Sequence, residues 1–159
     1  MPSAKQASKP NLNSAKALLL DNQLCFALYS TSLAMTKLYK PLLAALNLTY
    51  PQYLVMLVLW ENDALTVSAL GERLYLDSGT LTPLLKRMEQ LGLLVRVRSA
   101  QDERRVEVSL TDAGRKLKGR AAAVPGCVLE ASQCSIAELK ALTTELQDLR
   151  ERLNYQPAG

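Results

Sequence analysis

Cysteine is the most reactive side chain in this sequence, and it occurs at positions 25, 127 and 134. A cysteine thiolate is a nucleophile that can attack a peroxide or another sulfur. The chain has no histidine, which excludes histidine-based catalytic triads, histidine metal sites and imidazole acid–base catalysis. It also lacks CxxC pairs and the glycine-rich signatures of nucleotide binding. We therefore expect no metal, no cofactor and no enzyme activity of the conventional kinds.

Cys25 lies beside Phe26 in an apolar segment, where a single cysteine usually serves as a small side chain of the core. On the residues alone we favour that reading. The first residues, 1–16, are polar, and the longest apolar run, 53–60, is too short to span a bilayer. We expect a cytoplasmic protein that does not enter a membrane, in which three cysteines are poor candidates for structural disulfides.

The positive charge of the chain is concentrated in one segment. The net charge is only +4, but residues 86–120 carry ten Lys or Arg against five Asp or Glu. The rest of the chain carries nine basic and ten acidic residues. Taken alone, such a run is usually a solvated surface, but it is also the local basic footprint that a phosphate backbone requires.

The elements around this basic segment follow from periodicity. Two short helices are expected at 67–74 and about 78–91, the second capped by Asp77 or Ser78, and residues 75–77 separate them as in a helix-turn-helix. Two alternating strands follow, 94–98 and 105–109, each with valines on one face and charges on the other. A basic hairpin directly after a helix-turn-helix is a wing.

Long helices flank this region. One is expected from about Ser14 to Leu46 with a kink at Pro41, and the next begins at Thr49–Gln52 and runs through the core. Thr111 is expected to cap a helix that runs past Ala123 and bends at Pro125–Gly126. The last helix starts at the capping box Ser135–Glu138. A leucine stripe follows the last helix and indicates a dimer seam more than a core face, at Leu139, Leu142, Leu146, Leu149 and Leu153.

The predicted fold is mainly helical with a small β-wing. Residues 1–13 are expected to be a disordered tail, 14–48 and 111–154 a helical dimerisation region, and 49–110 the winged helix-turn-helix. The chain overall would form a single structural domain.

The segment 65–114 resembles the MarR family of dimeric winged-helix regulators. Within it, 74–87 (LYLDSGTLTPLLKR) resembles the organic-hydroperoxide-sensing, or OhrR-like, group, and Asp102–Arg105 fits the Asp-x-Arg pattern of that family's wing. The resemblance extends over roughly 17–153. It implies a homodimeric repressor that binds an inverted-repeat operator in double-stranded DNA and is released by an organic hydroperoxide.

The resemblance also implies a redox sensor. Cys25 matches the reactive cysteine of the group's first helix, and Tyr39 and Tyr50 match two tyrosines of the partner subunit that hydrogen-bond its sulfur. With no histidine present, tyrosine hydroxyls are the remaining donors that could stabilise a thiolate. Oxidation would give a sulfenic acid that Cys127 or Cys134 traps as a disulfide, with Cys127 slightly favoured. An apolar lining would favour organic peroxides, from Phe26, Leu28, Met56 or Trp60.

Recognition of DNA is expected from the second helix of the helix-turn-helix and from the wing. Short hydroxyl side chains at its start, followed by two cations, would contact bases and phosphates in the major groove, at Ser78, Thr80, Thr82, Lys86 and Arg87. Arg104 would enter the minor groove, with Asp102 holding its guanidinium in a bidentate pair. The remaining wing arginines would neutralise phosphates, at Arg96, Arg98 and Arg105.

Three other functions fit parts of the sequence. A MarR-type repressor released by a small phenolic or lipophilic ligand would need the fold but not Cys25. A thiol-based redox enzyme would need partners around the cysteine that the sequence does not show. A helical interaction adaptor would explain the leucine stripe but leave the basic wing without a role.

Overall fold

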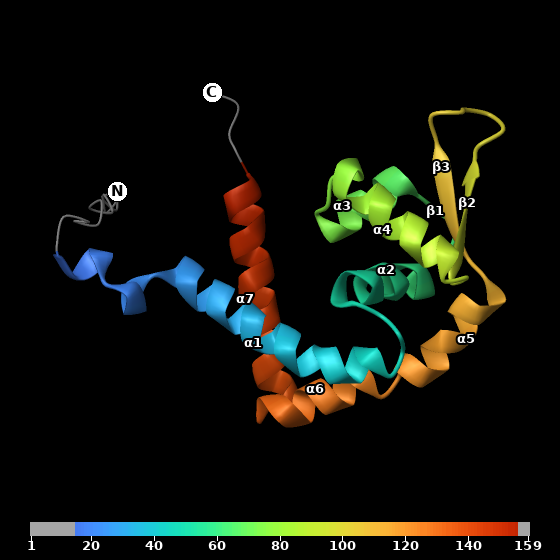
Figure 1. Cartoon of the computed structure of the whole chain (residues 1–159). Coiled ribbons are helices and arrows are strands. Elements are labelled where there is room, and N and C mark those ends of the chain that lie inside the picture. Colours follow the sequence, from blue (N-terminus) through green and yellow to red (C-terminus); the bar gives the residue numbers. More distant parts are fainter. Residues whose placement is uncertain (1–14, 156–159) are drawn as a thin grey trace, which may run out of the picture. The chain divides into compact units, whose positions relative to one another are not determined.

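The structure is a computed structural model that describes residues 15–155 (Figure 1), so the tail expected at 1–13 lies outside the described residues. The chain divides into two compact units after Lys37. Between residues 15 and 155 no helix has both the length and the apolar character to cross a bilayer. The fold is mainly helical with one small sheet, as the sequence predicts.

The first unit contains two 3-10 turns and the start of helix α1. The turns cover Ala15–Leu18 and Leu20–Asn22, and α1 spans Leu24–Ala44. The prediction of one helix from about Ser14 is therefore wrong in its first turns. The Gln23 side-chain amide donates to the carbonyls of Ala17 and Leu19 at 2.8 and 2.9 Å, and such side-chain bonds to the backbone compete with helix formation.

Helix α2 (Tyr50–Glu61) passes through the core of the second unit. It begins at the predicted capping box, in which Thr49 and Gln52 exchange side-chain and main-chain hydrogen bonds. Val55, Met56 and Leu59 on this helix are fully or almost fully buried. Leu57, by contrast, is 40% exposed, so one edge of α2 lies outside the core.

The predicted helix-turn-helix is confirmed by helices α3 (Val67–Leu74) and α4 (Ser78–Gln90). Tyr75 ends α3 in the left-handed conformation, with φ at 57°. The turn packs so closely that a Cβ on Gly71 would lie 2.7 Å from the Leu76 carbonyl oxygen, which requires glycine there. The buried stripe of α4 consists of Leu81, Leu85 and Met88, whereas Leu91, the last residue of the predicted helix, lies past the helix end and is half exposed.

The sheet has three antiparallel strands in the order β1–β3–β2, namely Leu65–Thr66, Val106–Leu110 and Leu94–Arg98. Strand β1 has only two residues, too few for an alternating pattern, and was not predicted. The register pairs Leu94 with Leu110 and Arg96 with Val108, so these residues share the covered face. Val95 and Val97 therefore lie on the exposed face of β2.

Three helices complete the second unit, α5 (Asp112–Ala121), α6 (Val124–Ser132) and α7 (Ile136–Asn154). Thr111 caps α5, and Ser135 with Glu138 forms the capping box of α7, both as predicted. The break between α5 and α6 comes at Ala122–Ala123, before the predicted bend, because Pro125 stands in the first turn of α6, where its missing N–H is tolerated. The core joins α2, α3, α4, the sheet and α5, around Met56, Leu59, Leu70, Leu81, Leu85, Met88, Leu94, Val108 and Leu117.

Candidate nucleic-acid interface and sensor cysteine

The start of α4 presents the predicted hydroxyl side chains to solvent. Ser78, Thr80 and Thr82 are all exposed, and so are Lys86 and Arg87 further along the helix. Asp77 caps this end by accepting the Thr80 N–H at 2.7 Å. This hydrogen bond lowers the pKa of the Asp77 carboxyl below its usual value, so the cap stays charged near neutral pH.

A groove of about 450 Å³ brings the helix-turn-helix and the wing together. Ser78 and Thr82 of α4 line one part of it, and Arg96, Arg104 and Arg105 of the wing line another. No acidic side chain lines the groove within residues 15–155. Three arginines and several hydroxyl side chains in one groove form a surface suited to a polyanion.

Two hydroxyl residues of this groove were missed in the sequence, Thr66 and Ser68 at the start of α3. Thr66 caps α3 by accepting the Ala69 N–H at 3.1 Å. The signal that could have found them is the Thr-Val-Ser-Ala start of α3, since a cap residue and an N–H-rich first turn favour anions.

Asp102 has a different role from the one predicted. No ion pair joins its carboxylate to the Arg104 guanidinium in the described part of the chain. Instead the carboxylate accepts the main-chain N–H of Arg104 at 3.0 Å, and the Asp102 carbonyl accepts the N–H of Arg105. A short aspartate side chain reaches the amide two residues on more easily than the end of an arginine. Asp102 therefore shapes the wing tip and leaves the Arg104 side chain exposed.

Arg96 has a partner within the protein that the sequence did not predict. Glu89 of α4 accepts the main-chain N–H of Arg96 at 2.8 Å and lies 3.4 Å from its Nε. These contacts, the main-chain N–H first, lower the pKa of the Glu89 carboxyl. Arg96 therefore has an anionic partner within the protein, whereas Arg98 and Arg105 are exposed on the same hairpin.

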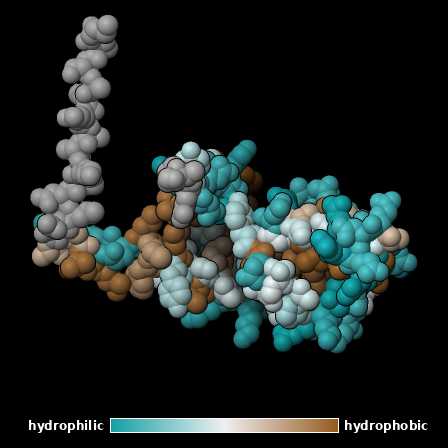
Figure 2. Space-filling view, turned by 90° about the horizontal axis from the view of Figure 1, so that it is seen from above, coloured by the Kyte–Doolittle hydropathy of each residue, from teal (hydrophilic) through white to brown (hydrophobic). Residues whose placement is uncertain are grey.

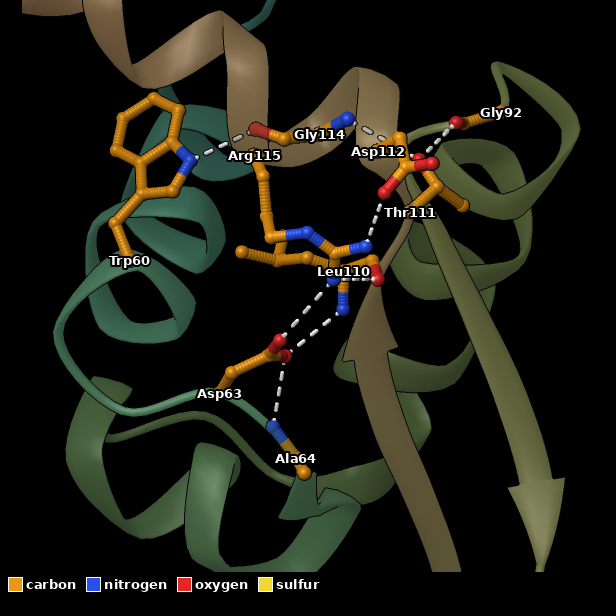
Figure 3. A network of polar contacts seen from close by, with 9 residues as sticks. All are labelled: Trp60, Asp63, Ala64, Gly92, Leu110, Thr111, Asp112, Gly114 and Arg115. Carbon is orange, nitrogen blue, oxygen red and sulfur yellow. Dashed lines mark hydrogen bonds and ion pairs between the residues drawn. The ribbon is translucent and has the colours of Figure 1, made fainter.

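The base of the wing is fixed by a polar network between α2, β3 and α5 (Figure 3). The Asp63 carboxylate accepts the N–H groups of Ala64 and Leu110 at 2.8 and 2.9 Å. Arg115 donates to the Leu110 carbonyl at 2.9 Å and pairs with Asp63 at 3.7 Å and with Asp112. These contacts tie the end of β3 to the loop after α2 and to the start of α5.

Two further contacts close this junction. The Trp60 indole N–H donates to the Gly114 carbonyl at 2.9 Å, and the Thr111 hydroxyl donates to the Gly92 carbonyl (Figure 3). A Cβ on Gly114 would lie 2.1 Å from the Leu93 carbonyl oxygen, so α5 approaches the wing as closely as glycine allows. The orientation of the wing is thus set by its base.

Cys25 is exposed in the second residue of α1. Its neighbours are apolar and also exposed, including Leu24 and Phe26. Figure 2 shows brown, hydrophobic surface interspersed with teal next to the grey N-terminal trace. Within its own unit, Cys25 is therefore not the buried core residue that its apolar neighbours in the sequence favour.

The two predicted sensor tyrosines lie together in the second unit. The Tyr39 and Tyr50 rings have centroids 5.0 Å apart, and Tyr53 stands 6.0 and 6.4 Å from them. Burial, and for Tyr39 and Tyr53 also the neighbouring tyrosines, raises the pKa of all three phenols. They therefore keep their protons, and remain hydrogen-bond donors, across the physiological range. Tyr53 was missed because it reads as part of the apolar core run.

The remaining cysteines differ in accessibility. Cys127 is exposed on α6, whereas Cys134 is partly buried between α6 and α7, its sulfur 3.4 Å from the Ser132 carbonyl oxygen. The predicted apolar lining is wrong for Met56, which is fully buried in the core and cannot line a peroxide site. Trp60, another residue of the predicted lining, donates its indole N–H to the Gly114 carbonyl.

Comparison with known proteins agrees with this geometry. Residues 37–120 match the family described as transcriptional regulator SarA/Rot. The organic hydroperoxide resistance transcriptional regulator of Bacillus subtilis is 57% identical over 137 residues, which are 86% of this chain and 93% of that protein.

Solved structures show the same fold. Reduced AbfR bound to DNA matches with a TM-score of 0.71 at 36% identity, covering 86% of this chain and 96% of that one. The disulfide form of AbfR, a protein of Staphylococcus epidermidis, matches with a TM-score of 0.58 at 39% identity, covering 82% and 91%. The chain therefore belongs to the SarA/Rot family of winged-helix transcriptional regulators and, among MarR-type proteins, to the organic-hydroperoxide regulator group.

Proposed function

We propose that this protein is a homodimeric repressor that binds an inverted-repeat operator and releases it when an organic hydroperoxide oxidises Cys25. The observation that carries the DNA-binding part is the groove in which the start of α4 meets the wing arginines. The relatives support both parts, because one is a regulator of organic hydroperoxide resistance and another has been solved on DNA.

On DNA, α4 enters the major groove with Ser78, Thr80 and Thr82 against bases and phosphates. Arg104 at the wing tip reaches the minor groove, and Arg98 and Arg105 contact phosphates. Lys86 and Arg87 add charge along α4. We call the winged helix-turn-helix, residues 49–110, the DNA-binding head. In a dimer, two such heads about 34 Å apart read two half-sites related by a twofold axis.

The dimer is supported by apolar side chains that the single chain leaves uncovered. In the first unit these include Leu20, Leu24 and Leu33. On α7 the predicted leucine stripe is exposed at Leu142, Leu146 and Leu153, the last by 68%. Covering both sets in a second copy of the chain removes this apolar area from water.

The sensor step is a two-electron oxidation of the Cys25 sulfur by the hydroperoxide. The Cys25 thiolate attacks one oxygen of ROOH, an S–O bond forms, the O–O bond breaks, and RO⁻ leaves and takes up a proton to become ROH. The partner subunit's Tyr39 and Tyr50 donate hydrogen bonds to the sulfur anion. Their raised pKa suits this role, because a neutral phenol donates where a phenolate would repel the thiolate.

The sulfenic acid is then trapped by a second thiol, which forms an S–S bond and releases water. We assign this role to Cys127 rather than Cys134, because Cys127 is exposed and Cys134 is partly buried. Formation of the disulfide displaces the helices that carry both cysteines and changes the spacing of the two heads.

Mass spectrometry of the intact protein tests the sensor. After one equivalent of an organic hydroperoxide, the Cys127→Ser variant should gain one oxygen on Cys25, whereas the wild type should lose two hydrogens and yield a Cys25–Cys127 peptide. Cys134→Ser is the matched control and should behave as the wild type. A Cys25–Cys134 peptide would overturn the assignment of Cys127, and an unmodified Cys25 would overturn the sensor.

One observation favours a second candidate, a repressor released by a lipophilic ligand. A largely apolar pocket of about 300 Å³ lies between α2 and α5, with Tyr53, Leu57 and Trp60 on one side and Lys118 on the other. This reading does not need Cys25. A response to inducer that survives Cys25→Ser would favour it.

A further inference from the structure

Helix α7 contacts the turn of the helix-turn-helix through one arginine. The Arg150 guanidinium carbon lies 4.3 Å from the centroid of the Tyr75 ring, within the range of a cation–π interaction. Tyr75 is the left-handed residue that ends α3, two residues before the Asp77 cap of α4. The contact therefore falls on the segment that sets the angle between α3 and the recognition helix.

The surroundings make this contact stand out. A cavity of about 530 Å³ surrounds it, to which α7, as far as the structure describes it, contributes Arg150 alone. The other lining residues belong to α2 and α3, namely Leu54, Ala69, Glu72, Arg73, Leu74 and Tyr75. Arg73 is held by Glu61 at 2.7 Å, and no carboxylate pairs with Arg150 between residues 15 and 155. The Tyr75 ring is thus the partner of this cation.

We propose that the Arg150–Tyr75 contact holds the DNA-reading head against α7 and that both are positioning residues, which fix the spacing of the two recognition helices. This inference rests on the proposed function as a DNA-binding dimer. The exposed leucine stripe of α7 indicates that α7 is a dimer helix. A contact from α7 to the head therefore couples the position of α4 to the arrangement of the two subunits. A head without this bond turns more freely about its other attachments.

The contact itself can be tested without DNA. Hydrogen–deuterium exchange of the reduced protein should become about two- to fivefold faster in residues 71–77 of Arg150→Gln, the factor expected for loss of one exposed cation–π contact. Arg152→Gln is the matched control on the same helix, because the Arg152 Nε donates only within α7, to the Asp148 carbonyl, in the described residues. Equal exchange in both variants would overturn the proposal.

The positioning role is tested by spacing. The reduced wild type selects a tight-binding duplex from random DNA, and Kd is then measured for that duplex and for one with a single base pair inserted at its centre. The ratio of the two Kd values should shrink about two- to fivefold in Arg150→Gln and Tyr75→Leu. It should stay unchanged in Arg152→Gln and in Tyr75→Phe, which keeps the ring.

A merely structural role predicts something else, an equal loss of affinity for both duplexes with the ratio unchanged, and that result would overturn the proposal. If the reduced protein selects no duplex at all, the proposed function fails and this inference fails with it. In that case the exchange experiment still shows whether Arg150 contacts the turn.

Discussion

Single residues determine the chemistry that this fold can perform. The absence of histidine leaves thiols as the reactive groups, and the sequence identifies Cys25 only through its resemblance to a family. The structure adds that Cys25 is exposed and that three tyrosines cluster elsewhere in the chain. The third, Tyr53, could not be predicted, because a tyrosine within an apolar run looks the same whether it packs on leucines or on other tyrosines.

The tyrosine cluster predicts a loss of stability in alkali. Burial holds the pKa of Tyr39, Tyr50 and Tyr53 above 10.0, the value of the unfolded chain. Above pH 10.0 the unfolded chain therefore loses these protons first, and the free energy of unfolding should fall until the pH reaches the folded pKa. Urea unfolding between pH 8 and 11 should show this fall, and Tyr39→Phe should make it smaller.

The matched control for this titration is Tyr155→Phe, because Tyr155 is 74% exposed at the end of the described chain. It should leave the fall unchanged. A Tyr39→Phe protein with the same alkaline loss as the wild type would show that burial of this phenol does not govern the effect.

At the scale of elements, capping and periodicity predicted most of the DNA-binding unit. The bounds of α3 and α4 and the caps at Thr49, Thr111 and Ser135 follow from local sequence. Two features could not be predicted from local sequence, because they depend on pairing with residues distant in the chain. Strand β1 exists because β3 pairs with it, and Arg96 faces inward because of the register with Val108.

The polar network at the wing base predicts that loss of Asp63 weakens DNA binding, although Asp63 does not line the groove. Asp63→Ala removes the acceptor of two main-chain N–H groups and a partner of Arg115, which should cost about 1–3 kcal/mol of unfolding free energy. DNA affinity should fall as well, because β3 and the wing lose their anchor. Urea unfolding and fluorescence anisotropy measure the two effects.

Glu145→Gln, an exposed change on α7, should leave both quantities unaltered. Wild-type DNA affinity in a destabilised Asp63→Ala protein would show that the wing keeps its orientation without this network.

At the scale of the whole molecule, the uncovered apolar surface and the basic groove are the features that support the two proposed partners, a second copy and DNA. The basic footprint was visible in the sequence as a charge surplus between 86 and 120. The sequence did not show which of these basic residues line the groove and which are used elsewhere. In the structure Arg104 and Arg105 line the groove, whereas Arg115 of α5 is engaged at the wing base. Only the fold separates the arginines that line the groove from the arginines that hold the protein together.

This division predicts different salt dependences for two arginines of the same hairpin. Arg105→Gln should lower the slope of log K against log salt by about 1.8 per dimer, or about 0.9 for each lost phosphate contact. Arg96→Gln should change the slope much less, because Glu89 already pairs with Arg96. Anisotropy titrations from about 50 to 200 mM salt measure both; equal slopes in the two variants would contradict the assignment.

The proposed function requires that one protein binds operator DNA and releases it through oxidation of one cysteine. Its most direct test is fluorescence anisotropy of the reduced protein on its selected duplex, before and after one equivalent of an organic hydroperoxide, with Cys25→Ser alongside. Both proteins should bind tightly, and oxidation should abolish binding by the wild type but not by the variant. Binding that survives peroxide in the wild type, or is lost equally in Cys25→Ser, would contradict it.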